Sequence, residues 1–293
     1  MPSIAHMTAH DNDIIRNRRL AVLGALTADE DILAHFPGND GADNYKTPLP
    51  WPELRGCLGI LFTSRSGSTF LSREIEKRYA IGRVRESFNL PALRARARST
   101  RLDTLAAAAR HSIVQLRENG WFGFKAGGPG LAVAERCGFL DHYLARAVFI
   151  LLLRRDIIAQ AVSLVKARST TIYHSGQYAR KTSEPATYSF DEISRAVRKI
   201  VRGTSLVENY ARMTERPCKK AYYEDFASGN FVIIDAICSE FGVPARARPP
   251  KHRVQEVEKI GDHVNEEWCA QFRAQMDGRM HDLLEEYRTI LER

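Results

Sequence analysis

The chain has 293 residues and no long hydrophobic run; the longest, residues 147–153, has arginines on both sides. A membrane-spanning helix needs roughly 20 apolar residues, so we expect no transmembrane segment. No apolar stretch follows the N-terminus, where Asp11, Asp13 and Arg16 lie, so we also expect no secretory signal. Both expectations favour a cytoplasmic protein.

Cysteine is scarce: the five cysteines are scattered along the chain and form no Cys-x-x-Cys pair. Several stand in apolar or helical surroundings, so we expect buried free thiols in a reducing compartment rather than disulfides. The nine histidines form no cluster with metal-ligand spacing. The sequence therefore predicts no metal site.

Acidic residues are in deficit, with 35 Asp and Glu against 43 Lys and Arg, which gives a net charge of +8 at pH 7. This surplus suits an anionic partner: nucleic acid, a membrane surface or a polyanionic small molecule. The hydrophobic content of 44% and the charged content of 27% are ordinary for a soluble globular protein. Charge alone does not choose among these partners.

The hydrophobic pattern predicts buried strands that alternate with helices. We expect strands at 57–63, 121–125, 148–153 and 220–226, and helices at 14–26, 102–116, 156–167, from 189 onward, 230–241 and 265–291. Such alternation is typical of an α/β fold with a parallel sheet and helices on both faces. Residues 1–54 are interpreted as an N-terminal extension, because 35–52 is rich in Gly, Asn, Asp and Pro, and 55–293 as one α/β domain.

The most informative stretch is 57–79, where a buried strand leads through a turn of small residues into a helix. The turn consists of Ser64, Arg65, Ser66, Gly67, Ser68 and Thr69. This arrangement directs several backbone N–H groups and a helix N-terminus at one place, which favours a bound phosphate or sulfate, and Arg65 adds a planar cation. The alternative is an ordinary connection whose hydroxyls only cap the helix. The lysine of a P-loop is absent.

A second basic strand end lies at 153–163, where Arg154 and Arg155 precede a helix that carries Gln160 and Ser163. A loop arginine and a helix serine can hold one phosphate together if the local fold brings them close. The alternative is an arginine pair that is solvated or that bridges Asp156.

Together these stretches resemble the bacterial sulfotransferases typified by trehalose 2-sulfotransferase, which use 3′-phosphoadenosine 5′-phosphosulfate (PAPS). The segments that carry the resemblance are 63–69, 83–88, 122–125, 153–163 with its continuation to 174, and 258–268. The resemblance implies the P-loop-like sulfotransferase fold, a central parallel sheet flanked by helices on both faces. It also implies PAPS as co-substrate without a metal, and it suggests a homodimer.

Site residues follow from the resemblance. Those implied for the 5′-phosphosulfate are Arg65, Ser66, Gly67, Ser68 and Thr69, and those for the 3′-phosphate are Arg154, Arg155 and Ser163. Glu86 would be the general base that deprotonates a hydroxyl of a carbohydrate, glycolipid or other small metabolite, with His111 and His174 as rival bases. Lys125 and Arg65 would stabilise charge on the transferring group.

Some positions depart from the family pattern. Glu86 follows Gly82-Arg-Val-Arg where the family has a proline, Ser87 follows Glu86 where an aromatic is common, and Ala126-Gly-Gly-Pro129 follows Lys125 in place of bulky residues. These departures concern the acceptor rather than the donor.

Two other functions remain as alternatives at this stage. One is a nucleotide kinase of related fold, although only Asp156 resembles a magnesium ligand at a strand end. The other is a nucleic-acid-binding protein, because Arg94, Arg96, Arg98 and Arg101 form a basic run. That run has almost no aromatic interleaving, so we expect no nucleic acid as partner.

Overall fold

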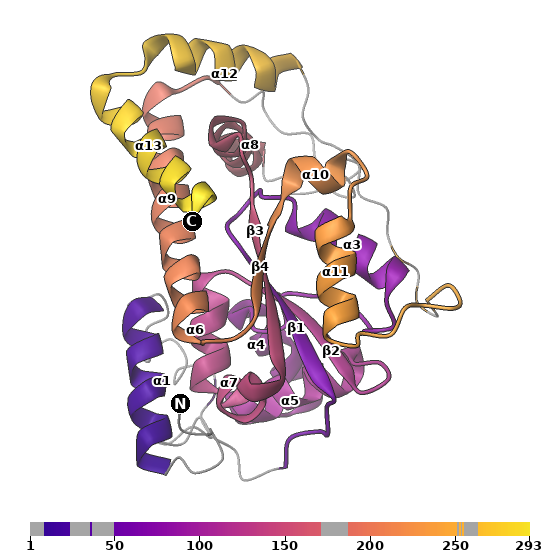
Figure 1. Cartoon of the computed structure of the whole chain (residues 1–293). Coiled ribbons are helices and arrows are strands. Elements are labelled where there is room, and N and C mark those ends of the chain that lie inside the picture. Colours follow the sequence, from indigo (N-terminus) through magenta and orange to yellow (C-terminus); the bar gives the residue numbers. More distant parts are fainter. Residues whose placement is uncertain are drawn as a thin grey trace.

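The computed structural model describes residues 9–23, 36, 50–170, 187–250, 252, 254 and 263–293. Within these residues a four-stranded sheet in the order β2-β1-β3-β4 forms the centre of the molecule (Figure 1). The strands are β1 (Gly56–Phe62), β2 (Trp121–Ala126), β3 (Ala147–Leu153) and β4 (Cys218–Tyr222). Every neighbouring pair is parallel, so the predicted parallel α/β sheet is confirmed.

Helices surround this sheet and connect its strands. They are α1 (Ala9–Leu23), α3 (Ser68–Arg78), α4 (Leu90–Thr100), α5 (Leu105–Leu116), α6 (Gly128–Arg136), α7 (Phe139–Tyr143), α8 (Ile157–Thr170), α9 (Phe190–Met213), α10 (Tyr223–Ala227), α11 (Val232–Glu240), α12 (His263–Gln275) and α13 (Gly278–Glu292). Figure 1 shows α3 and α11 on one side of the sheet and α6 and α9 on the other.

The two faces of the sheet bury different residues because side chains alternate along a strand. Phe149 and Leu151 of β3 belong to the core beneath α5, α6 and part of α9. Ile150 and Leu152 belong to the core beneath α3 and α11. Strands that are apolar on both faces need helices on both, which explains the continuous apolar run of β3.

Several predicted helix ends are present. Asp156 caps α8 by accepting the Ala159 N–H at 2.9 Å, and Ser189 caps α9 by accepting the Glu192 N–H at 3.3 Å. Side chains at these positions satisfy N–H groups that have no partner within the helix.

Two predicted boundaries are wrong. The single helix expected over 265–291 is two helices, because Asp277 accepts the Met280 N–H at 2.9 Å and so starts α13 as a separate helix. The strand expected over 220–226 ends at Tyr222, and the residues after it form α10.

The helix predicted near the N-terminus is α1, and it lies against α6 and α9. Its Arg19 donates to both carboxylate oxygens of Glu135 on α6, at 2.5 and 2.9 Å. Leu23, at the end of α1, lies in the core. This part of the predicted N-terminal extension is therefore built onto the sheet domain. No helix among the described ranges is long and apolar enough to cross a membrane.

Candidate active site

The turn between β1 and α3 has an unusual backbone. Arg65 and Gly67 both adopt left-handed conformations, with φ of 68° and 90°. Left-handed residues in a turn make successive N–H groups converge on one point, an arrangement that binds anions. At Gly67 any other residue is also excluded by space, since a Cβ would stand 2.4 Å from the Tyr223 ring.

Several polar groups of this turn have no hydrogen-bond partner among the described residues. No side chain of the described residues caps the N-terminus of α3, so its first N–H groups have no capping acceptor. Ser66 is almost fully buried, and its Oγ has no partner among the described residues. Buried polar atoms are rarely left without a partner, so this unpartnered oxygen fits a turn that closes on a ligand.

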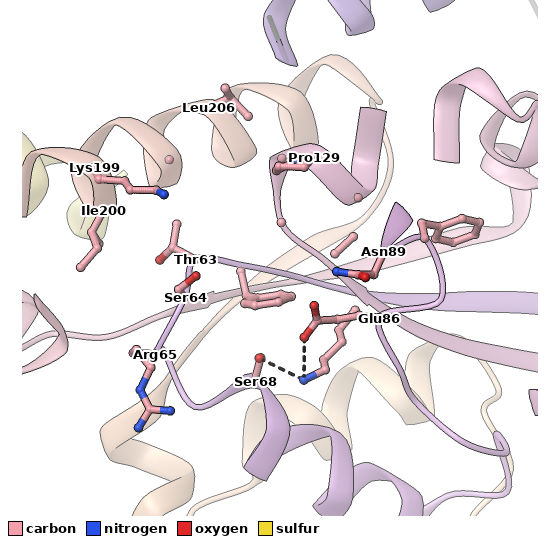
Figure 2. A pocket seen from close by; sticks show the side chains of 18 of the residues that line it. Thr63, Ser64, Arg65, Ser68, Glu86, Asn89, Pro129, Lys199, Ile200 and Leu206 are labelled. Carbon is pink, nitrogen blue, oxygen red and sulfur yellow. Dashed lines mark hydrogen bonds and ion pairs between the residues drawn. The ribbon is translucent and has the colours of Figure 1, made fainter. Parts of the chain in front are cut away.

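Lys125 joins the turn to a carboxylate. It lies near the end of β2, beside β1, so the parallel register brings it to the same edge as the turn. Its Nζ donates to Thr69 Oγ1 at 2.8 Å. It also donates to Ser68 Oγ at 3.4 Å and lies 3.3 Å from Glu86 Oε1, the two contacts marked by dashed lines in Figure 2. Burial lowers the pKa of Lys125, and the charge of Glu86 opposes that shift.

The backbone explains why Glu86 reaches this place. The Lys125 N–H donates to the carbonyl of Arg85 at 2.9 Å, which fastens the segment before Glu86 along β2. Glu76, fully buried on α3, accepts the Val84 N–H at 2.9 Å and also binds the guanidinium of Arg85. The sequence did not single out Glu76, because its role depends on contacts between α3 and the 83–86 segment.

A cavity of about 1330 Å³ opens beside these groups. Of the predicted site residues, it contains Arg65, Ser68, Glu86 and Lys125 in its wall. The other walls are the starts of α4 and α6 and one face of α9. Figure 2 shows Glu86 and Asn89 on one side of this space and Lys199 and Leu206 of α9 on the other.

The two predicted anion motifs are in contact. Arg65 Nε donates to Ser163 Oγ at 3.0 Å, and Gln160 Nε2 donates to Thr63 Oγ1 at 3.0 Å and to the Ser64 carbonyl at 2.8 Å. The guanidinium of Arg154 lies 4.8 Å from the centre of the Tyr223 ring. The fold therefore brings the strand end before α8 up to the turn.

Arg155 has a different environment. Its guanidinium forms two hydrogen bonds with Asp225, at 2.7 and 3.0 Å, and these raise the pKa of Arg155. It does not contact Ser163 through any hydrogen bond between described residues; Ser163 instead accepts from Arg65. Arg154, Arg155 and Ser163 lie outside the lining of the cavity.

Sequence reasoning missed the acidic turn of α10. Glu224 accepts the backbone N–H of Arg155 at 3.1 Å and that of Asp156 at 3.3 Å, while Asp225 holds the Arg155 side chain. The available signal was the adjacent acidic pair Glu224 and Asp225 near the end of a predicted strand. Of the rival bases, His111 lies on α5 away from the cavity lining, and His174 lies outside the described residues.

The strand ends of this parallel sheet bring together a turn with converging N–H groups, a buried lysine and an exposed carboxylate, an arrangement typical of α/β proteins that handle anionic groups. The model of the Stf0 sulphotransferase family matches residues 129–275, half of the chain, and the chain belongs to this family. The protein is therefore a sulfotransferase, as the resemblance implied, and neither the kinase nor the nucleic-acid alternative is retained. No curated protein matches the chain.

The range matched by the family model covers only part of the candidate site. It includes Arg154, Arg155 and Ser163 and leaves out the turn at 63–69, Glu86 and Lys125. The roles of the latter groups therefore rest on geometry and on the sequence resemblance.

Proposed function

We propose that this sulfotransferase moves a sulfuryl group from PAPS to a hydroxyl of a carbohydrate, glycolipid or other small metabolite, with Glu86 as general base. The position of Lys125, within 3.3 Å of Glu86 and 2.8 Å of Thr69, supports this most directly. One cation thereby touches both the turn that would hold the donor and the carboxylate that would receive the proton. We also propose that the protein acts in the cytoplasm and as a homodimer.

The turn fits an anionic donor end. Its surplus N–H groups, the unpartnered Ser66 Oγ and the Arg65 guanidinium supply donors, and the buried Lys125 supplies a charge. Bound there, PAPS supplies the sulfuryl group. Donors fixed before binding stabilise the charge that develops during transfer without having to reorganise. Arg154 and Ser163, which contact Arg65, would bind the 3′-phosphate, and Arg155 would join them if it exchanges Asp225 for that phosphate.

Glu86 would accept the proton that the acceptor oxygen loses as its bond to sulfur forms. Its side chain is 46% exposed and stands in the cavity wall, so an acceptor hydroxyl can approach it. Lys125 holds the carboxylate at the edge of the turn, where nucleophile and leaving group must be aligned.

Calorimetric titration with 3′-phosphoadenosine 5′-phosphate (PAP), with ADP and AMP as controls, tests the donor assignment. We expect PAP alone to bind tightly, and Ser163→Ala or Arg155→Ala to weaken it about tenfold, the size of one charge-assisted hydrogen bond. Arg288→Ala, on the surface of α13, is the matched control. Equal binding of ADP and PAP would contradict the proposal.

A further inference from the structure

Helix α9 presents a row of cations to the cavity. Arg195, Arg198, Lys199 and Arg202 all belong to its wall. Their spacing of three and four residues places them on one side of the helix, because α-helical residues at that spacing share a face. Figure 2 shows Lys199 projecting from α9 toward the side on which Thr63 and Ser64 lie.

In the part of the chain that the structure describes, no acidic side chain pairs with this row. Among the described residues, Arg198, Lys199 and Arg202 take part in no ion pair, and Arg195 donates only to the backbone carbonyl of Asp191. Cations three or four residues apart on a helix repel one another and lower its stability. The row therefore destabilises the helix in the absence of an anion, and a bound anion would offset that cost.

The cavity holds little negative charge of its own. Glu86 is the one carboxylate in its described lining, and Lys125 lies against it. Cations in a concave site with few counter-charges attract and concentrate anions.

The donor does not account for this row. The residues proposed for the 3′-phosphate, Arg154, Arg155 and Ser163, lie outside the cavity lining and connect to the turn through the contact of Arg65 with Ser163. Helix α9 meets the end of β1 at Gly203, directly after Arg202, where a Cβ would stand 3.1 Å from Thr63 Cγ2. From that point the cation row extends toward the N-terminal end of α9, to Arg195.

The size and lining of the cavity suit a second substrate. At about 1330 Å³ it exceeds the 300–1,000 Å³ that is usual for a single small-molecule site. Phe62, Leu90, Pro129 and Leu206 give it accessible apolar surface, on which the carbon face of a sugar ring can pack.

From these observations we infer that the α9 row is an acceptor subsite, and that the acceptor is a saccharide that already bears an anionic group. Arg198, Lys199 and Arg202 bind that group, a carboxylate or a phosphoryl or sulfuryl ester, while a free hydroxyl of the same molecule reaches Glu86. This inference rests on the proposed function, since it assigns the substrate class of the same site.

Matched pairs of saccharides test it with the full-length protein saturated with PAP. One pair is glucose and glucuronic acid, which differ only in the carboxylate at C6; the other is glucose and glucose 6-phosphate, which differ only in the phosphate. Binding is measured by calorimetry at low and high salt, and sulfuryl transfer from PAPS is measured on the same compounds. The two pairs distinguish a carboxylate from a phosphate as the recognised group.

We expect the anionic member of at least one pair to bind at least about tenfold more tightly, and the preference to shrink as salt rises. Arg198→Gln combined with Arg202→Gln should abolish the preference without weakening PAP. Arg212→Gln combined with Arg288→Gln changes the net charge equally but lies outside the cavity lining, and should preserve it.

Two failures have different meanings. If PAP does not bind, the proposed function is wrong. If PAP binds but neither pair shows a preference for its anionic member, or the preference survives the Arg198 and Arg202 substitutions, the subsite is wrong and the proposed function stands.

Discussion

Glu86 and Glu135 both face a buried cation, yet their surroundings differ. Glu135 is fully buried, and its carboxylate accepts two hydrogen bonds from Arg19 and one from Tyr210. Glu86 is 46% exposed and has Lys125 as its ion-pair partner. A carboxylate whose oxygens are all occupied stabilises the fold, whereas one with a single partner and an open side can exchange a proton with a substrate. Exposure and free hydrogen-bonding capacity separate the two roles.

The largest effect should come from the open carboxylate. Glu86→Gln keeps the shape but removes the base, so we expect sulfuryl transfer to fall by about 10²–10⁴-fold. Steady-state kinetics with PAPS measure this, and PAP titration should show no loss of affinity. Glu118→Gln is the control, because Glu118 also pairs with a cation, Arg246, but lies outside the cavity lining. Full activity of Glu86→Gln would exclude Glu86 as the base.

Substitution of the buried Glu135 should lower stability and leave activity unchanged, the opposite of what we expect for Glu86. Glu135→Gln removes the charge that Arg19 faces in the interior, so we expect the free energy of unfolding to fall by about 3–5 kcal/mol. Urea unfolding measures it, with the exposed Glu285→Gln as control. Activity per folded molecule should be unchanged at a temperature where the variant is folded. If Glu135→Gln lowered sulfuryl transfer without lowering stability, the structural role assigned to Glu135 would be wrong.

We expect Lys125, the ion-pair partner of Glu86, to make activity depend on pH. Because burial lowers the pKa of Lys125, its charge is lost as pH rises through that lowered pKa, below the range in which an ordinary lysine titrates. Lys125→Arg keeps its charge throughout this range. We expect the alkaline fall of kcat/KM to move up by about one pH unit or more in Lys125→Arg, despite lower activity at neutral pH. An unchanged alkaline limb would mean that another group titrates there.

The smallest effect concerns Glu118, whose side chain is 35% exposed, and its partner Arg246. Hydrogen bonding to Arg246 lowers the pKa of Glu118, so the carboxylate stabilises the fold above its unfolded pKa, and this contribution is lost as pH falls through the folded pKa. We expect Glu118→Gln to cost less than about 1 kcal/mol at neutral pH, because Glu118 is partly exposed and solvent screens its charge. The difference from wild type should vanish in acid unfolding titrations; a constant difference at all pH values would contradict this.

The sequence was sufficient for the sheet and for much of the candidate site. Continuous apolar runs identify β1 and β3 because strands buried on both faces tolerate little else. The turn at 63–69 is local, so its small residues and glycine are readable in order. Lys125 and Ser163 could be named through the resemblance, although their contacts with Thr69 and Arg65 join elements far apart in the chain.

Other features depend on long-range contacts that no local pattern encodes. Glu76 is important because it accepts a hydrogen bond from the Val84 N–H, which lies beyond the end of α3. The cations of α9 could be interpreted only once the structure showed that they line the cavity. The break between α12 and α13 was readable in principle, since Asp277 and Gly278 are a cap and a weak helix former. The hydrophobic spacing is regular on both sides of this break, so the pattern predicted one continuous helix.

Helix α1 has a practical consequence for the boundaries of this protein. It precedes both the sheet and the range matched by the family model, so the domain boundary predicted from the sequence would start an expressed fragment near Arg55. Such a fragment would lack Arg19, so the buried carboxylate of Glu135 on α6 would lose its cation. Asp141 would lose the same partner. The smallest piece that folds should therefore begin before α1, ahead of the region that resembles other sulfotransferases.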